Sequence, residues 1–285
     1  MNNNTLVEEQ NEIIARNQAN LLEMGFSGTF NFVFTEGITD VEFLSRFAKP
    51  NTIIFYVGSK NELFKLEKDS SLIVKNYICI CDKDYDECSD MKNFFYYDYC
   101  SQETMLLYSR DSYKPYSTYF SLANKVLKMI RDEAANKLLV ISCTRKFYDS
   151  RSIPFKITKF LEKNYSMCKS NKKAFETMFI KKLSESNCSV DDINSIVFMQ
   201  KEVNQHQIPE ITNGHDLMEV FFVCLLEYVK TIDYNGIIGQ ANKMQYTNNH
   251  FAPAIRKLYL ESDFKNSRLY KSLKSICGNN GNNYF

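Results

Sequence analysis

A run of closely spaced carboxylates follows an apolar stretch in the first third of the chain. Residues 77–87 read YICICDKDYDE, in which a strand-like segment leads directly into Asp82, Asp84 and Asp86. Like charges at this spacing repel one another, so the cluster is either spread out in solvent or held together by a positive group. For Asp86 we expect solvent exposure.

A further carboxylate, Glu36, follows another strand-like run, FNFVF at residues 30–34. Functional groups of a parallel α/β sheet gather beyond the carboxyl ends of the strands, so Glu36 can meet Asp82 and Asp84 across the intervening sequence. Mg²⁺ prefers hard oxygen ligands, needs few of them from the protein, and keeps waters or substrate phosphates in its other positions. These three residues are therefore candidate catalytic ligands of Mg²⁺ or Mn²⁺.

The pattern around these residues predicts strands that alternate with short helices. Capping-box patterns at Thr39/Glu42 and Ser59/Glu62 predict helix starts after the first and second strands. Such alternation is typical of an α/β fold with a mainly parallel sheet flanked by helices. The expected strands are 30–34, 52–57, LIVKNYICIC (72–81) and 94–99.

The C-terminal half has a mostly helical pattern, and prolines stand near the inferred breaks. One possible strand is KLLVIS (137–142), and the low-complexity tail CGNNGNNYF suggests disorder over 277–285. The expected organisation is an N-terminal helix (1–27), a metal-binding domain (28–115), a basic helical region (116–276) and the tail. The expected helices of this half are 117–135, 155–183, 189–201, 215–232 and 252–275.

Charge is distributed unevenly along the chain. Residues 1–115 hold 11 Lys and Arg against 18 Asp and Glu, a net charge of −7, whereas residues 116–285 hold 24 against 16, a net charge of +8. A basic surface beside an acidic pocket suits metal-dependent chemistry on a polyanion, although a solvated helical face explains the basic residues equally well. The candidate substrate contacts are Lys83, Arg145, Lys146 and Arg151.

Composition excludes several other classes of protein. No apolar run approaches the roughly 18 residues of a membrane span, and the first residues lack the pattern of a secretion signal, so we expect a cytoplasmic protein without membrane contact. The 9 cysteines form no CxxC pair and the 3 histidines are scattered, so neither a disulfide framework nor a zinc site is indicated. A phosphate-binding GxxxxGK[ST] loop is absent, so any ATPase must be a separate chain.

The acidic segments together resemble a known family. VFTEGITDVEFL followed by ICICDKDYD is similar to the TOPRIM fold of topoisomerases, primases and OLD-type nucleases, whose signature is a Glu after the first strand and a DxD after a later one. With FFYYDYCSQETMLL and NGHDLMEVFFVCLL added, the order resembles a TOPRIM subfamily of bacterial defence loci, the AriB-type nuclease effectors of PARIS anti-phage systems. The resemblance covers residues 30–110 and extends loosely into the C-terminal half.

The resemblance implies roles for five acidic residues. Glu36 matches the metal ligand and general base, and Asp82 and Asp84 match the ligands of the DxD pair. Asp40 matches the ExxxD spacing of OLD-type enzymes, and Glu103 matches the Glu after the fourth strand. Both have an alternative, because a carboxylate in the first turn of a helix is stabilised by about 0.3–1 kcal/mol without any metal.

The resemblance also implies an activity and partners. It implies a toxic, metal-dependent nuclease that cleaves RNA, specifically tRNA, that an ABC-like ATPase partner holds inactive until infection, and that acts as a homodimer. Two alternatives remain open: a DNA-directed TOPRIM nuclease, and a non-catalytic regulatory or sensor subunit whose acidic loops bind the ATPase. Hydrolysis that depends on Mg²⁺ and is abolished by EDTA distinguishes the enzyme from the subunit.

Overall fold

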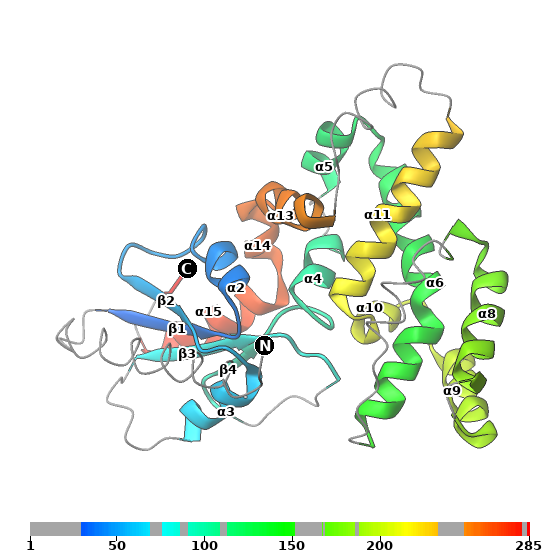
Figure 1. Ribbon diagram of the computed structural model, residues 1–285. Coiled ribbons are helices and arrows are strands. Elements are labelled where there is room, and N and C mark those ends of the chain that lie inside the picture. The colour runs from blue at the N-terminus through cyan, green and yellow to red at the C-terminus, as the bar shows by residue number, and fades with distance from the viewer. Residues whose placement is uncertain are drawn as a thin grey trace, which may run out of the picture. The chain divides into compact units, whose positions relative to one another are not determined.

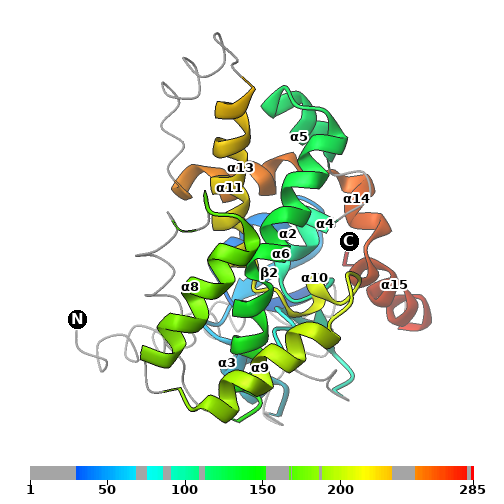
Figure 2. The same cartoon turned by 90° about the vertical axis from the view of Figure 1, so that its right-hand side faces the viewer.

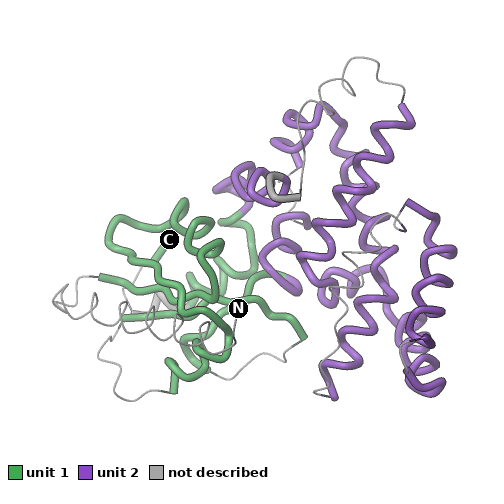
Figure 3. The backbone as a smooth tube through the Cα atoms, viewed as in Figure 1, with its two compact units in different colours: residues 1–98, 264–285 green, residues 99–263 purple. Residues whose placement is uncertain are grey.

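The computed structural model divides the chain into two compact units (Figure 3). Unit 1 comprises residues 1–98 and 264–285, and unit 2 comprises residues 99–263. The division falls after Asp98 rather than near residue 115, and the last segment of the chain joins the first. The structure describes residues 30–68, 76–85, 91–108, 113–151, 167, 169–185, 188–232, 248–280 and 284–285, so the helix expected within 1–27 lies outside them.

Unit 1 is built on a parallel four-stranded sheet, which confirms the expected α/β class (Figure 1). The strand order is β2-β1-β3-β4, so β1 lies between the strands that follow it in sequence. Strand β2 pairs with one side of β1, and β3 pairs with the other side, with β4 beyond it. The strands are β1 (Asn31–Thr35), β2 (Thr52–Tyr56), β3 (Tyr77–Cys81) and β4 (Phe94–Tyr96).

Alternation of side chains along the strands creates two apolar faces. On one face, Phe32 and Phe34 of β1 pack with Cys79 and Cys81 of β3 and with Leu63 from helix α3 (Lys60–Lys68). The described cysteines are free, and burial raises the pKa of the Cys79 and Cys81 thiols, as expected of reduced core residues.

Helix α2 (Ile38–Leu44) and the turn after it contribute aromatic packing with the segment of unit 1 that begins at Phe264. Phe43 contacts Phe264 edge to face at 6.3 Å, and Phe47 stacks on the same ring at 4.4 Å between centroids. Helix α15 (Arg268–Asn280) packs near β4, and its first two N–H groups donate to Asp98. The core of unit 1 therefore includes side chains from both of its sequence segments.

The expected disorder of residues 277–285 is wrong where the structure describes that segment. Helix α15 continues to Asn280, and Tyr284 and Phe285 are buried at 5% and 7% exposure. The carbonyl of Tyr284 accepts hydrogen bonds from Lys49 N–H and Thr52 Oγ1, at 3.0 and 2.8 Å. Burial of these two aromatic side chains stabilises the position of the last two residues, although the residues before them are rich in Asn and Gly.

Unit 2 is helical throughout its described part, with α6 (Asn124–Asp149) at its centre (Figures 1 and 2). The expected strand at 137–142 is wrong, because this apolar run forms the buried middle of α6 and packs against α11. Short apolar runs in strands and in buried helices cannot be told apart by periodicity. The other helices of unit 2 are α4 (Gln102–Tyr108), α5 (Tyr113–Phe120), α8 (Lys172–Glu185), α9 (Val190–Glu202), α10 (Ile208–Ile211), α11 (Gly214–Thr231), α13 (Asn248–Leu258) and α14 (Glu261–Asn266), the last of which crosses into unit 1.

Within the described residues, none of the helices combines the length and apolar composition needed to cross a lipid bilayer.

Candidate functional site

The carboxyl ends of β1 and β3 bring Glu36 and Asp82 together, as the sequence predicts. Phe34 pairs with Cys79 and Thr35 with Ile80, so the residues after the two strands emerge side by side. The backbone N–H of Asp82 donates to Oε1 of Glu36 at 3.0 Å. The sheet order reverses direction at β1, and such switch points are where ligands of α/β sheets bind.

The backbone of Glu36 is held by the neighbouring strand as well. The carbonyl of Glu36 accepts from Gly58 N–H at 3.0 Å, just after Val57 N–H donates to the carbonyl of Thr35 at 2.9 Å. Gly58 has a φ of 99°, which a residue with a Cβ rarely adopts. Backbone pairing between the two segments thus continues one residue past the end of β1 and fixes the position of the Glu36 backbone.

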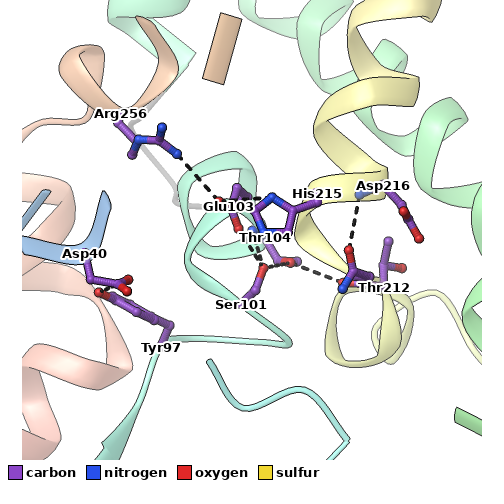
Figure 4. A network of polar contacts seen from close by, with 10 residues as sticks. Asp40, Tyr97, Ser101, Glu103, Thr104, Thr212, His215, Asp216 and Arg256 are labelled. Atoms are coloured by element: carbon purple, nitrogen blue, oxygen red, sulfur yellow. Dashed lines mark hydrogen bonds and ion pairs between the residues drawn. The ribbon is translucent and has the colours of Figure 1, made fainter. Parts of the chain in front are cut away.

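Asp40 caps the helix that follows Glu36. Its Oδ2 accepts from the backbone N–H of Gly37 at 3.0 Å, and its Oδ1 accepts from the hydroxyl of Tyr97 at 2.9 Å, as Figure 4 shows for the second contact. The expected box of Thr39 and Glu42 is wrong, because α2 begins at Ile38 and its third residue is therefore Asp40. Both oxygens of Asp40 have donors without any metal.

Lys60, the first residue of α3, adds a positive charge beside the carboxyl ends of the strands. Its Nζ lies 2.8 Å from Oδ2 of Asp84 and 3.2 Å from the carbonyl oxygen of Lys83. The Lys60 side chain is 15% exposed, and its ammonium lies 5.9 Å from the centre of the Tyr96 ring. One lysine therefore binds both the backbone and the carboxylate of the acidic turn.

Asp84 takes up an unusual backbone conformation in that turn. Its φ is 51°, in the left-handed region, which among residues with a Cβ is most accessible to Asn and Asp. Its side chain is 43% exposed, and the chain turns sharply there after the buried end of β3. Non-glycine residues held in this region occur preferentially at binding sites and active sites.

Glu36 is the electrostatic centre of the group. Burial raises its pKa from 4.5 to about 7; Lys60 and the N–H of Asp82 lower it, whereas the negative charges of Asp84 and Asp40 raise it. The charges of Lys60, Asp84 and Asp40 therefore act on the Glu36 carboxyl group in surroundings that are only partly solvated. A carboxyl group with a pKa near neutrality can release or accept a proton under physiological conditions.

The three carboxylates of this group supply oxygen donors, the ligand type that a hard divalent cation prefers. In the part of the chain that the structure describes, no three His, Cys, Asp or Glu side chains are placed so that they could hold a metal ion. The donors of Glu36, Asp82 and Asp84 are nevertheless all oxygens at one sheet edge, and Asp84 already binds a cation, the ammonium of Lys60. The cation seen in this arrangement is the ammonium of Lys60, and the described residues do not form a metal site.

Glu103 lies in unit 2, in the first turn of α4, and has its own polar network (Figure 4). The residue is 5% exposed, its Oε2 accepts from Ser101 Oγ at 3.3 Å, and its Oε1 lies 3.7 Å from Nδ1 of His215 and 3.6 Å from a guanidinium nitrogen of Arg256. Gly214 borders this network, where a Cβ would lie 2.0 Å from Ser101 Oγ. The network needs no metal to compensate the charge of Glu103.

The candidate substrate contacts of unit 2 differ in their surroundings. Arg145 forms a bidentate ion pair with the buried Asp216, at 2.8 and 3.0 Å, which joins α6 to α11. Arg151 pairs with Asp192 at 2.6 Å and lies over the ring of Phe147. Lys146 is exposed on α6. Asp86 and much of the basic segment lie outside the described residues.

Sequence reasoning missed Lys60. It did identify Ser59 as the residue preceding α3, and Ser59 Oγ does accept from Glu62 N–H at 3.3 Å. A lysine at the first helical position is unfavourable beside the positive end of the helix dipole, and this local conflict was the available signal.

No protein-family model matches this sequence, and no curated protein is significantly similar to it.

Proposed function

We propose that this chain is a divalent-metal-dependent nuclease of the TOPRIM type, with its catalytic carboxylates at the carboxyl ends of β1 and β3. The observation that carries the proposal is the hydrogen bond between Glu36 and Asp82, which joins two segments far apart in the sequence at the switch point of a parallel sheet. Asp84 and its bound ammonium lie in the same turn.

Glu36, Asp82 and Asp84 would hold the metal, Mg²⁺ or Mn²⁺. When bound, such an ion supplies Lewis-acid activation of water and compensates charge on a scissile phosphate. In this proposal Glu36 would also accept the proton of the attacking water. Asp40 holds the turn at Gly37 that carries Glu36, and it serves as a positioning residue through its hydrogen bonds.

The resemblance to defence nucleases favours RNA, and tRNA in particular, as the substrate, with toxicity to the host restrained by an ABC-like ATPase partner. Lys146 and the basic segment near it supply candidate phosphate contacts in unit 2. A homodimer and a cytoplasmic location belong to the same proposal.

The test is incubation of purified protein with total tRNA, other RNA and DNA, in Mg²⁺ or in EDTA, beside Glu36→Ala and the exposed control Glu42→Ala. We expect Mg²⁺-dependent cleavage by the parent and by Glu42→Ala, and a loss of at least about 100-fold for Glu36→Ala. Cleavage by Glu36→Ala at the parental rate would refute the assignment, and cleavage of DNA alone would redirect it to a DNA nuclease.

A second candidate function is a non-catalytic regulatory or sensor subunit that binds an ATPase through its acidic edge. The observation in its favour is that Lys60 already compensates Asp84 without a metal. This candidate requires a complex with the ATPase that forms equally in Mg²⁺ and EDTA, and no hydrolysis of any nucleic acid.

A further inference from the structure

Helix α8 of unit 2 has an apolar side and a basic outer face. It packs against α6 and α9 of the same unit (Figure 2). The buried side chains of α8 are Phe175, Phe179 and Leu183. Because a helical turn takes 3.6 residues, Lys173, Thr177 and Lys181 lie on the opposite side of the helix, and all three are exposed. We call this row the outer face of α8.

The two lysines of the outer face have no counter-ion among the described residues. The ammonium groups of Lys173 and Lys181 form neither an ion pair nor a hydrogen bond there. The other two lysines of α8 each pair with a carboxylate of the helix: Lys172 with Glu176 at 3.8 Å and Lys182 with Glu185 at 2.6 Å. The pKa of Glu185 is lowered first by its hydrogen bond with Lys182, and the charge of Lys181 adds the smallest contribution.

No acidic residue interrupts the outer face. Thr177 stands between the two lysines, and its hydroxyl donates to the carbonyl of Lys173 at 2.9 Å, so it brings no charge. Lys173 and Lys181 are about 12 Å apart along the helix axis, at 1.5 Å per residue. A nucleic acid strand carries one negative charge per nucleotide, and lysine binds a phosphate as a point charge. Two flexible lysine side chains in one row can therefore contact phosphates of the same strand.

The outer face fits a nucleic acid better than a lipid surface. A helix that binds a membrane surface inserts an apolar face into it beside its basic residues. The apolar side of α8 is already buried inside unit 2, so the helix offers a partner positive charge without exposed apolar side chains at this row. Binding of a phosphate backbone depends mainly on such charge, because it releases the counter-ions condensed on the nucleic acid.

We propose that the outer face of α8, through Lys173 and Lys181, binds the phosphate backbone of the nucleic acid substrate. This inference rests on the proposed function for its choice of substrate, and it requires no metal ion. Contacts with phosphates fix the position of a strand and carry no base specificity. The outer face therefore contributes affinity and leaves the cleavage chemistry to other residues.

The experiment measures binding of fluorescently labelled tRNA to the full chain by anisotropy, in EDTA and at several salt concentrations. Lys173→Gln/Lys181→Gln should weaken binding about tenfold at about 0.1 M salt and lower the slope of log K against log salt by about 1.5, because two phosphate contacts are lost. The matched control is Lys114→Gln/Lys125→Gln, which removes the same charge from exposed positions on α5 and α6. Its tRNA affinity should stay within about threefold of the parental value, because no phosphate contact is lost.

Thermal unfolding confirms that each variant folds. Parental tRNA affinity of the Lys173→Gln/Lys181→Gln variant, or an equal loss of affinity in the control, would overturn the proposal. So would a loss of binding to vesicles of anionic lipid at unchanged tRNA affinity, which would assign the outer face to a membrane. Cleavage assays in Mg²⁺ separate this inference from the proposed function. A protein that binds tRNA through α8 and cleaves no nucleic acid refutes the nuclease alone, whereas a nuclease whose tRNA affinity is independent of Lys173 and Lys181 refutes this inference alone.

Discussion

The backbone N–H of Asp82 donates a hydrogen bond to the Glu36 carboxylate across the junction between β1 and β3. The two residues are 46 positions apart in sequence, and only the parallel pairing of their strands makes them neighbours. The contact fixes the Glu36 carboxylate at the carboxyl end of β1, the strand on either side of which β2 and β3 lie.

Glu36 should titrate near neutrality in the metal-free protein. Its pKa is about 7 in the folded state against 4.5 as the ordinary value, so the folded protein holds the proton more tightly than the unfolded chain does. The resulting stabilisation is complete below about pH 4.5 and is lost as the pH rises through 7. We therefore expect Glu36→Gln to have nearly the same free energy of unfolding as the parent at pH 4.5 and one about 3 kcal/mol higher at pH 8.

Urea unfolding in EDTA at the two pH values checks this prediction, and NMR titration of the Glu36 carboxyl carbon gives the pKa directly. A midpoint near 4.5 would show that burial of Glu36 does not control its ionisation.

The left-handed conformation of Asp84 predicts different costs for two neutral substitutions. Asp84→Asn and Asp84→Val both remove the ion pair with Lys60, but only asparagine tolerates a φ of 51°. We expect Asp84→Val to lower the free energy of unfolding by about 1–2 kcal/mol more than Asp84→Asn does. Unfolding in EDTA measures the difference, and equal stabilities would indicate that the turn relaxes without cost.

Arg145 should contribute to stability rather than to substrate binding. Its partner Asp216 is 4% exposed, and burial raises the pKa of Asp216 although Arg145 lowers it. Arg145→Met leaves that carboxylate unpaired, so we expect a loss of about 3–5 kcal/mol in the free energy of unfolding. The exposed neighbour Lys146 provides the control, with a change within about 0.5 kcal/mol for Lys146→Met.

Binding of tRNA by the same two variants separates the roles. Weaker tRNA binding by a fully folded Arg145→Met at unchanged stability would contradict the structural role. Weaker binding by Lys146→Met is the expected outcome for a phosphate contact.

Gly214 should be intolerant of a methyl group at the start of α11. An added Cβ would lie 2.0 Å from Ser101 Oγ and 2.7 Å from Glu103 Oε2, inside the buried polar network. We expect Gly214→Ala to lower the free energy of unfolding by about 1–3 kcal/mol, and the double variant with Ser101→Ala to recover part of that loss. Thermal and urea unfolding measure both, and an unchanged or raised stability of Gly214→Ala would show that α4 and α11 can separate at little cost.

The alternation of apolar strands and capped helices was sufficient to predict the α/β class of unit 1, because side-chain period and helix-start chemistry are local properties. The same local rules failed at residues 137–142, where an apolar run lies inside a long buried helix. They failed again at Tyr284 and Phe285, which are held by contacts that no local pattern shows. The carbonyl of Tyr284 accepts from Lys49 and Thr52, more than 200 residues earlier, and Phe285 packs against Phe264.

By itself, the sequence identified the carboxylates that directly follow apolar strands, where parallel sheets gather functional groups. Tertiary structure decided the rest, because the strand order puts β1 between β2 and β3 and so delivers Lys60 as well as Asp82 and Asp84 to the edge occupied by Glu36. No local pattern encodes that order, since it follows from which faces of the strands and helices can be buried together.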